Sequence, residues 1–411
     1  MKKNLFLLGL AVAAMTSCTN DEVLDVQQPV QKAIGFESFV NKTSRAVTET
    51  TTPSETKDND GNVTAIGGLK KFYAYGYYQS TPATSVFDGI AVTRNIFPST
   101  QSEKATAYWN YDLDGVNGNE DLAYWTSNIY QFGAYANGID TNPLTFTGDD
   151  EITFGAEGNT VNLTIPQYVV SDQNDLVAAI TTVDNSRLSN GKVDMDFKHL
   201  LTKIKFSVKN NDTKYKMRIT SALVVKNVYK QGKCVVSKDP NVDKTNITTV
   251  WTPTDNVDEV DYSTLFTANK NDDSDDKVNN MLDLAGNSTG VSLESGFIQI
   301  GKYVESDELF VMPQDLADIQ IQITASFYDG NSQEVSNKTF TLPVTGTIVE
   351  ETPASGETPA GTKQVWAANT YYNYIISLPT SATPIEFGNV TVGDWTTGTP
   401  IELNPTGSVG Q

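Results

Sequence analysis

The feature that most constrains this chain is a two-residue alternation of apolar and polar side chains. In residues 319–327, IQIQITASF, the side chains of Ile319, Ile321 and Ile323 share one face, and the intervening polar side chains share the other. Residues 202–210, TKIKFSVKN, alternate in the same way. Successive side chains of a β-strand point to opposite faces of a sheet, so this period predicts strands rather than helices.

Seven further segments carry the same strand signal between clusters of turn-forming residues. They are residues 34–40 (IGFESFV), 71–78 (KFYAYGYY), 128–136 (NIYQFGAYA), 161–167 (VNLTIPQ), 308–313 (ELFVMP), 371–378 (YYNYIISL) and 388–395 (GNVTVGDW). Beyond the first residues, no segment shows a sustained helical stripe. We therefore predict an all-β protein of sandwich type.

Polar stretches divide the strand-rich chain. Residues 47–62 have almost no apolar content and are predicted to be flexible. A second polar stretch, TTVDNSRLSNGK, ends at Lys192. We place a domain boundary there, between residues 46–192 and residues 193–411. Within the second domain, residues 237–290 form a long polar insertion that is poor in strand signals.

The first residues have the pattern of an export signal. Lys2 and Lys3 precede a short apolar run that ends at Met15, and a bilayer span would take about 20 apolar residues. The segment MTSC, which ends at Cys18, resembles the lipobox of bacterial lipoproteins, although Met15 stands where leucine is usual. That resemblance implies a signal peptide over residues 1–17 and acylation of Cys18. A plain signal peptide with an incidental cysteine is the alternative.

The charge balance and the cysteine count exclude several classes of protein. Asp and Glu number 50 against 29 Lys and Arg, which gives a net charge of −21. Such an acidic surface repels nucleic acid and anionic membranes. Apart from Cys18 the chain contains only Cys234, so the exported protein can form no intramolecular disulfide. It has to be stabilised by a sizeable core.

The sequence does not supply a catalytic set. His199 is the single histidine, and without a second one neither a Ser-His-Asp triad elsewhere nor a histidine-rich zinc site is easily built. We predict that His199 is a hydrogen-bonded structural residue and that Cys234 is a partly buried, inert thiol. No glycine-rich phosphate loop occurs between a strand and a helix. We therefore expect a protein that is not an enzyme and needs no cofactor.

Two acidic clusters are candidates for calcium. Asp112 and Asp114 alternate in the stretch YDLDGVNGNED, and calcium loops use oxygen ligands at alternating positions bent by a glycine. This spacing completes no calcium loop, however, and Asp, Asn and Gly cluster mainly in turns. Residues 271–276, NDDSDD, are typical of a solvated loop. We therefore predict no metal site.

The order of the segments resembles a known family. Beyond the lipobox come IGFESFV with TSRA, then AYW, YQFGAYA, SDQNDLVAAI, MDFKHLLTKIKFSV, NVYKQGKCVVS, LFVMPQ, YYNYIISL and IEFGNVTVGDW. Together they resemble the fimbrillins, the subunits of type V pili of certain Gram-negative gut and oral bacteria. No single piece is a strong motif, and the order of the pieces over nearly the whole chain carries the likeness.

The resemblance implies a fold and a route to the cell surface. It implies two β-sandwich domains of transthyretin-like topology, and an outer-membrane precursor anchored by lipid through Cys18. It also implies trimming by an arginine-specific protease, with Arg45 at the matching position and cleavage before Ala46, so that residues 18–45 are a propeptide. Arg45 follows a predicted strand and precedes a polar stretch, where a protease can reach the backbone. An arginine that merely ends a strand is the alternative.

Cleavage after Arg45 would free the predicted strand at residues 34–40. Its loss would leave unpaired backbone groups and an open apolar groove, and such an edge invites another strand. A partner's extended segment can fill the groove by strand addition, head to tail, so that the contact propagates into a fibre. By elimination, the donor is the C-terminal end. Its candidate residues are Val390, Val392, Trp395, Ile401 and Leu403.

The expected function is that of a structural subunit of a cell-surface fimbrium that serves adhesion, with other copies of itself or other fimbrial subunits as partners. One alternative is a fimbrial tip or accessory adhesin. Another is a surface glycan-binding lipoprotein, whose aromatic residues in FYAYGYY and YYNYIISL stack on sugars. Alternating aromatics in strands are more often core residues and cross-strand pairs. A surface hydrolase has no residues to support it.

Overall fold

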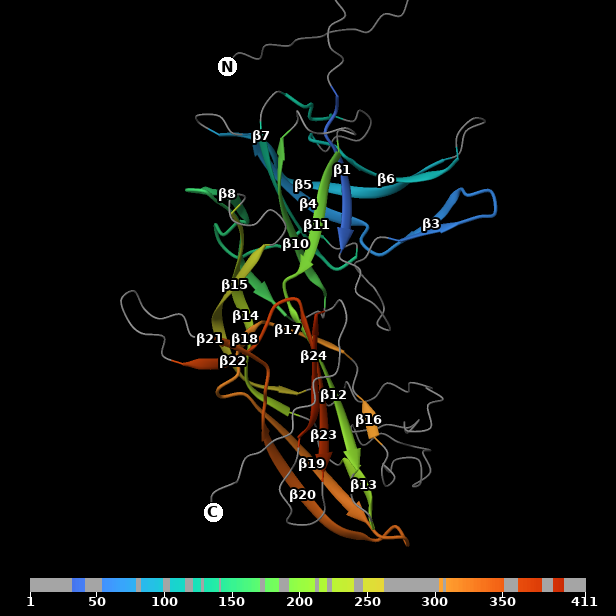
Figure 1. Cartoon of the computed structure of the whole chain (residues 1–411), viewed down its shortest axis with the longest axis vertical. Helices are drawn as coiled ribbons and strands as arrows, with labels where there is room; N and C mark the ends of the chain where they lie inside the picture. The colour runs from blue at the N-terminus through green and yellow to red at the C-terminus, as the bar shows by residue number, and fades with distance from the viewer. Residues whose placement is uncertain are drawn as a thin grey trace, which may run out of the picture.

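The fold of the chain is known from a computed structural model. It describes residues 32–40, 54–78, 83–98, 104–114, 121–126, 129–139, 142–170, 174–184, 192–210, 214–219, 224–239, 247–261, 303–305, 308–350, 361–378 and 387–394. Figure 1 shows an elongated arrangement of sheets along one axis. All the regular elements formed by these residues are β-strands, which confirms the prediction of an all-β protein. None of the described residues forms a helix long and apolar enough to cross a membrane.

The first sheet has seven strands. β1 runs parallel to its neighbour, and the other neighbours run antiparallel to one another. The spatial order is β1 (Gly35–Val40), β11 (Lys192–His199), β10 (Leu176–Asp184), β7 (Ile129–Asn137), β4 (Lys71–Tyr78), β5 (Thr84–Phe97) and β6 (Thr106–Tyr111).

The second sheet comes from the later part of the chain. Its spatial order is β16 (Tyr303–Glu305), β12 (Thr202–Asn210), β23 (Thr370–Leu378) and β24 (Phe387–Asp394), and β17 (Leu309–Val311) also pairs with β12. β12 is parallel to β23 and antiparallel to β16 and β17.

The third sheet joins the two halves of the chain. Its spatial order is β13 (Lys216–Ile219), β19 (Gln320–Tyr328), β14 (Val224–Lys238), β9 (Thr160–Val169) and β8 (Thr153–Glu157). β15 (Thr248–Asp261) pairs with β14, and β20 (Glu334–Pro343) pairs with β19. The beginning of β14 pairs with β19 and its end pairs with β9, so this one strand carries hydrogen bonds into both halves.

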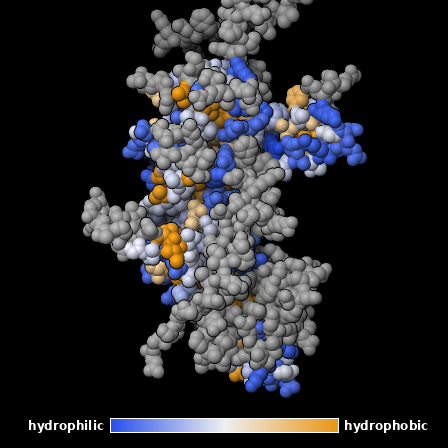
Figure 2. Space-filling view, viewed as in Figure 1, coloured by the Kyte–Doolittle hydropathy of each residue, from blue (hydrophilic) through white to orange (hydrophobic). Residues whose placement is uncertain are grey.

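Two small sheets complete the fold. One contains β18 (Gln314–Asp315), β22 (Thr362–Trp366) and β21 (Thr347–Glu350). The other is an antiparallel hairpin of β2 (Ser54–Lys57) and β3 (Val63–Gly67). This hairpin projects from the side of the first sheet (Figure 1), and the corresponding lobe of the surface is mostly hydrophilic (Figure 2).

Three apolar clusters lie between these sheets. The N-terminal core includes Ile34, Phe36, Phe72, Phe132 and Phe197. The middle core covers the opposite face of the first sheet and includes Tyr73, Tyr135, Leu163, Leu176 and Val236. The C-terminal core includes Ile204, Phe206, Ile321, Phe327 and Tyr374. Alternate residues of β4 point into the first two clusters, so this central strand is buried on both faces.

The structure confirms the strand predictions. β4 and β12 coincide with predicted residues 71–78 and 202–210, and the other predicted strands differ by at most two residues at each end. Strand existence is well determined because turn-forming residues bound each alternating run. The transthyretin-like topology stays a prediction.

The prediction that residues 47–62 are flexible is wrong for the part that the structure describes. Ser54–Lys57 form β2, and the turn that follows is closed by Asp58. The Asp58 carboxylate accepts hydrogen bonds from the Asn62 backbone N–H at 2.8 Å and the Asn62 side-chain amide at 3.0 Å. These bonds hold the pKa of Asp58 below its usual range. Local hydrogen bonds therefore order a segment that has no apolar residues to bury.

Two further segments refine the expected organisation. β15 lies within residues 237–290, so the predicted insertion contains a strand. β11 begins at Lys192 and belongs to the first sheet, whereas β12 belongs to the second. The domain division after Lys192 stays a prediction.

Candidate functional site

β1 lies between two chain segments that are distant from it in the sequence. On one side it pairs in parallel with β11 along its whole length. On the other side, the residues that lead into β1 contact residues 121–126. The Ile34 N–H donates to the Ala123 carbonyl at 2.8 Å, and the Trp125 N–H donates to the Lys32 carbonyl at 3.0 Å. The residues that lead into β1 therefore have backbone partners at residues 123–125, while β1 itself is the edge strand of the first sheet and pairs with β11.

Phe36 is the main side chain by which β1 closes the N-terminal core. It is 3% exposed. Its ring meets four others edge to face, at centroid distances of 5.7 Å (Phe72), 5.4 Å (Phe87), 5.7 Å (Tyr111) and 6.0 Å (Phe132). Burying one Phe or Ile side chain contributes about 1.5–3 kcal/mol, and edge-to-face ring pairs add to that. Removal of β1 would take the Phe36 ring out of this cluster and leave its four ring neighbours without that contact.

Tyr111 ties β6 to the residue that precedes β1. Its hydroxyl donates to the Ile34 carbonyl at 2.8 Å and accepts from the Ala123 N–H at 3.2 Å. Burial raises the pKa of Tyr111 well above its usual range, so the hydroxyl keeps its proton and remains a donor. The contact is to the backbone, so it does not depend on the side chain at position 34.

The outer face of β1 is polar and contributes much less. The Lys192 ammonium lies 2.6 Å from the Glu37 carboxylate, and the two side chains are 48% and 40% exposed. Such exposed pairs contribute about 0–1 kcal/mol. Glu37 is also the register partner of Asp194, whose pKa is raised by burial and further by Glu37, while Lys192 opposes the shift. The energy that holds β1 therefore resides on its inner face.

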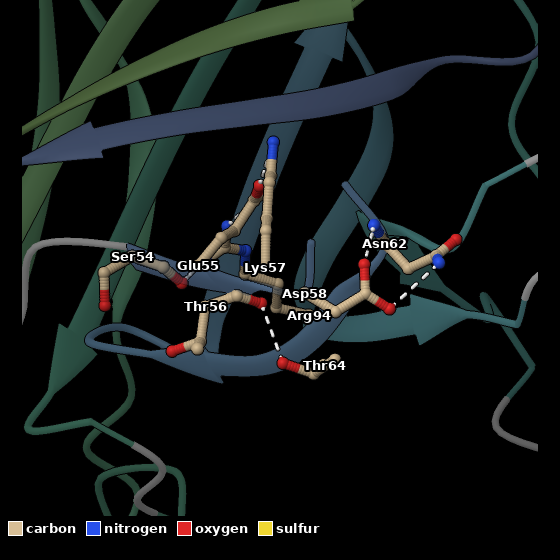
Figure 3. A network of polar contacts seen from close by, with 8 residues as sticks. All are labelled: Ser54, Glu55, Thr56, Lys57, Asp58, Asn62, Thr64 and Arg94. Atoms are coloured by element: carbon tan, nitrogen blue, oxygen red, sulfur yellow. Dashed lines mark hydrogen bonds and ion pairs between the residues drawn. The ribbon is translucent and has the colours of Figure 1, made fainter. Parts of the chain in front are cut away.

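A buried arginine attaches the β2–β3 hairpin beside this site. The Arg94 guanidinium, on β5, donates to the Ser54 carbonyl at 3.0 Å, the Gly67 carbonyl at 3.4 Å and the Glu55 carboxylate at 2.9 Å. Figure 3 shows these residues with the Asp58 turn. Arg94 also lies over the Trp109 ring at 6.0 Å. In the sequence, the one signal of this role is that Arg94 is a lone cation in the alternating stretch AVTRNIF.

Most of the predicted site residues lie outside the described residues. These are Cys18, Arg45, Ala46, Trp395, Ile401 and Leu403. Val390 and Val392 lie in β24, where they pair with Tyr374 and Tyr372 of β23. Their role as donor-strand residues stays a prediction.

The chemistry-bearing residues have structural roles. His199 Nδ1 lies 2.9 Å from the Asp175 carboxylate and both are buried, which confirms the prediction of a hydrogen-bonded histidine. Cys234 is completely buried rather than partly buried, because its side chain packs in the middle core, and burial raises the pKa of its thiol. Asp112 accepts the Asp114 and Asp121 N–H groups, as a turn former does. Among the described residues, no cluster of His, Cys, Asp and Glu could hold a metal.

The aromatic residues considered for sugar stacking are mostly core residues. Tyr73 and Tyr75 are 6% and 9% exposed, and Tyr372 and Tyr374 are completely buried. Tyr73 stacks on Tyr135 at 5.3 Å, and Tyr372 stacks on Tyr374 at 6.2 Å. They stabilise the sheets and present no exposed platform.

The fold and this site define an all-β protein in which a strand from near the N-terminus, β1, pairs in parallel with the distant β11 and closes the N-terminal core. Residues 79–395 match the sequence profile of a family described as Fimbrillin-like. Because the match spans most of the chain, the protein belongs to the Fimbrillin-like family of fimbrial, cell-adhesion proteins, which are not enzymes. No curated protein matches the chain.

The chain is also similar to solved structures. A fimbrial protein from Bacteroides vulgatus is 18% identical, with a TM-score of 0.42, over 79% of this chain and 93% of that one. The fimbrial anchor protein Mfa2 from Porphyromonas gingivalis is 10% identical, with a TM-score of 0.28, over 90% of this chain and 98% of that one.

Proposed function

We propose that the protein is a structural subunit of a cell-surface fimbrium that polymerises after its N-terminal strand is removed. Family membership implies association with other fimbrial subunits. The strand to be removed is β1, and the site that receives a replacement is the edge of β11 that β1 covers.

The observation that carries this proposal is the position of β1. It supplies Ile34 and Phe36 to the N-terminal core, and they are 1% and 3% exposed. Its covalent connection to the rest of the domain runs through residues 41–53, which contain Arg45. A single cut there would leave β1 held by non-covalent contacts alone. A strand that can be detached without cutting the remaining domain is suited to exchange.

Cys18 and Arg45 would act in sequence. Acylation of Cys18 holds the precursor at the outer membrane, and cleavage between Arg45 and Ala46 separates the lipid-linked segment from everything that follows. Detachment of β1 would leave the β11 backbone unpaired and the rings around Phe36 in contact with water. Both features favour uptake of another strand.

The proposed donor is the C-terminal end of a neighbouring subunit. In this chain, β24 pairs only with β23 among the described strands, so it can detach without splitting the second sheet. Donor and acceptor surfaces differ, so the contact is heterologous and extends into a fibre. A tip or accessory adhesin, which accepts a strand without donating one, is the alternative within the family. The burial of the tyrosines in β4 and β23 argues against the glycan-binding alternative.

The experiment that tests this function compares Arg45→Ala with Lys42→Ala in cells that assemble the fimbria. Arg45→Ala should accumulate as a longer, lipid-linked and unpolymerised form. Lys42→Ala removes a nearby cation and should be processed and assembled as the wild type is. Intact mass and electron microscopy of surface fractions provide the readout. Normal fibres from Arg45→Ala would rule out the cut as a requirement.

A further inference from the structure

The segment that leads into β1 is held by hydrogen bonds to its backbone. The Ile34 N–H donates to the Ala123 carbonyl at 2.8 Å, and the Trp125 N–H donates to the Lys32 carbonyl at 3.0 Å. The Tyr111 hydroxyl donates to the Ile34 carbonyl at 2.8 Å. These three bonds fix the position of an entering segment, and none of them depends on a side chain of that segment.

The pairing with β11 begins just after these bonds. Gly35 is the first residue in register, opposite Lys192, and Glu37 is opposite Asp194. Because the entry bonds use the backbone of residues 32 and 34, position 33 lies ahead of the ladder. A proline, which has no N–H, therefore costs no ladder hydrogen bond at position 33.

The two faces of the entering segment meet different chemistry. The inner face carries the buried Ile34 and Phe36. On the outer face, the Lys192 ammonium lies 2.6 Å from the Glu37 carboxylate. Gly35 has no side chain, so β1 contacts Lys192 from position 37 rather than from the position in register with it. A segment suited to this edge has two apolar residues two positions apart, with an acidic residue between them opposite Lys192.

The sequence beyond β24 contains such a segment. Residues 395–411 include one pair of aliphatic residues two positions apart, Ile401 and Leu403. The residue between them, Glu402, is the single charged residue of that stretch, and Pro400 precedes the pair. Residues two apart on a strand belong to the same face, so an extended segment here would direct the aliphatic pair to one side and the carboxylate to the other.

We propose that the Ile-Glu-Leu segment of a second copy, residues 401–403, takes the place of residues 34–36 and runs parallel to β11. Its two aliphatic side chains enter the N-terminal core, and its carboxylate lies opposite Lys192. The inference rests on the proposed function and deepens it by assigning the donor residues and their register. The docked segment lies beyond β24, so Val390 and Val392 keep their pairing in the second sheet.

The proline and the charge set the register. In the proposed frame, Pro400 falls at position 33, ahead of the ladder, and the N–H and carbonyl of Ile401 replace those of Ile34 in the entry bonds. A frame shifted by two residues would put Pro400 at position 35, inside the ladder, where a proline is disfavoured. It would also put Glu402 opposite Asp194, and like charges directly opposite each other are destabilising.

The test uses the full chain in dilute solution, cut once after Arg45 so that β1 stays bound without a covalent link. A synthetic peptide of residues 396–408 is offered in large excess, and release of the bound N-terminal fragment is followed by intact mass. The Ile401→Ala peptide should displace β1 at least about tenfold less well. The Leu403→Phe peptide should displace it at least about fivefold better, because its ring recovers the contacts of Phe36. Ile401→Phe is the matched control and should bring no gain.

A charge-reversal cycle tests the register. On the wild-type chain, the Glu402→Lys peptide should displace β1 about threefold to fivefold less well than the unaltered peptide. On a Lys192→Glu chain, the order of the two peptides should reverse. Loss of the contact between Lys192 and Glu37 affects the release of β1 by every peptide alike, so the ratio of two peptides on one chain is compared. A Thr397→Lys peptide, which adds a cation ahead of the docked segment, is the control and should give the same ratio on both chains.

The outcomes separate this inference from the proposed function. The same ratio for the Glu402→Lys peptide on both chains would overturn the register, and so would a gain by that peptide on the wild-type chain, which a position opposite Asp194 would produce. Stronger displacement by a peptide of residues 387–397 would overturn the choice of donor segment. Each of these results leaves strand exchange intact. A cut protein that retains its fragment against every peptide, including one of residues 32–45, overturns both the inference and the proposed function.

Discussion

The hydroxyl of Tyr111 donates a 2.8 Å hydrogen bond to the carbonyl oxygen of Ile34, 77 positions earlier in the chain. The bond joins β6, at one edge of the first sheet, to the residue that leads into β1 at the other edge. It binds backbone rather than a side chain, so any strand in this position can accept it. The bond therefore fixes the position of a strand at this edge but does not select its sequence.

Tyr111→Phe should therefore loosen β1 without opening a cavity. We expect the free energy of unfolding to fall by about 1–2 kcal/mol, because a buried carbonyl loses its donor. Urea denaturation provides the measurement. Tyr108→Phe, which removes a hydroxyl from a side chain that is 36% exposed, should stay within about 0.5 kcal/mol of wild type. Equal effects of the two changes would contradict a special role for the Tyr111 hydroxyl.

Arg94→Ala should detach the β2–β3 hairpin while leaving the first sheet folded. The change removes three hydrogen bonds to the hairpin, and we expect a loss of about 1–3 kcal/mol. Hydrogen exchange of the amides in residues 54–67 should accelerate, with little change in β4 and β7. Lys57→Ala serves as the control, since Lys57 pairs with Glu55 but is 55% exposed. Unchanged exchange in the hairpin of the Arg94 variant would refute the anchoring role.

The stability of the β1 edge should fall as pH rises through the titration of Asp194. Burial, and then Glu37, raises the pKa of Asp194 above its ordinary value of 3.8. The folded protein therefore holds this proton more tightly than the unfolded chain does. The resulting stabilisation is complete below the ordinary value and is lost as pH rises through the raised one.

Asp194→Asn should consequently gain stability relative to wild type as pH rises above the ordinary carboxyl pKa, by less than about 1 kcal/mol because the site is partly exposed. Denaturation at several pH values gives the difference. Asp58→Asn should change the stability in the opposite direction. Hydrogen bonds lower the pKa of Asp58, so the ionised Asp58 stabilises the folded protein above its ordinary pKa, and the Asn variant should lose that stabilisation. A pH-independent difference for Asp194→Asn would contradict the assignment.

Cys18 should carry the lipid of the precursor. Each buried methylene of an acyl chain contributes about 0.8 kcal/mol to membrane binding, and stable anchoring takes at least two chains. Cys18→Ala should abolish labelling by radioactive palmitate and move the protein to the soluble fraction. Cys234→Ala is the control and should keep the label, because the Cys234 thiol is completely buried. Wild-type protein without lipid by mass spectrometry would exclude the anchor.

Deletion of residues 396–411 should yield folded monomers that do not extend a fibre. The deletion leaves β24 complete but removes Ile401 and Leu403 from the proposed donor. Circular dichroism would confirm folding, and electron microscopy would score fibres. If the truncated protein polymerises alone, C-terminal donation is wrong. If the intact protein never polymerises alone but ends fibres of another subunit, it is a tip.

The sequence by itself determined nine of the strands and the alternation of side chains within them, while others, such as β5, β6 and β15, lie outside the predicted segments. In β12, Ile204 and Phe206 alternate with polar neighbours, and in β19, Ile321 and Ile323 do the same. This alternation is a local property of the sequence, so it does not depend on any other part of the chain. The sequence also determined the negative result on catalysis, since a single histidine limits what any fold can assemble.

Only the tertiary structure decided which strands meet. Nothing within residues 34–40 indicates that β1 pairs in parallel with β11, because strand pairing depends on backbone hydrogen bonds that carry no side-chain identity. The same holds for Arg94, whose guanidinium donates to residues of the distant β2–β3 hairpin. The order of Ser54–Lys57 was missed because hydrogen bonds stabilise that segment, locally around Asp58 and from the distant Arg94, and an apolar pattern does not reveal either kind of bond.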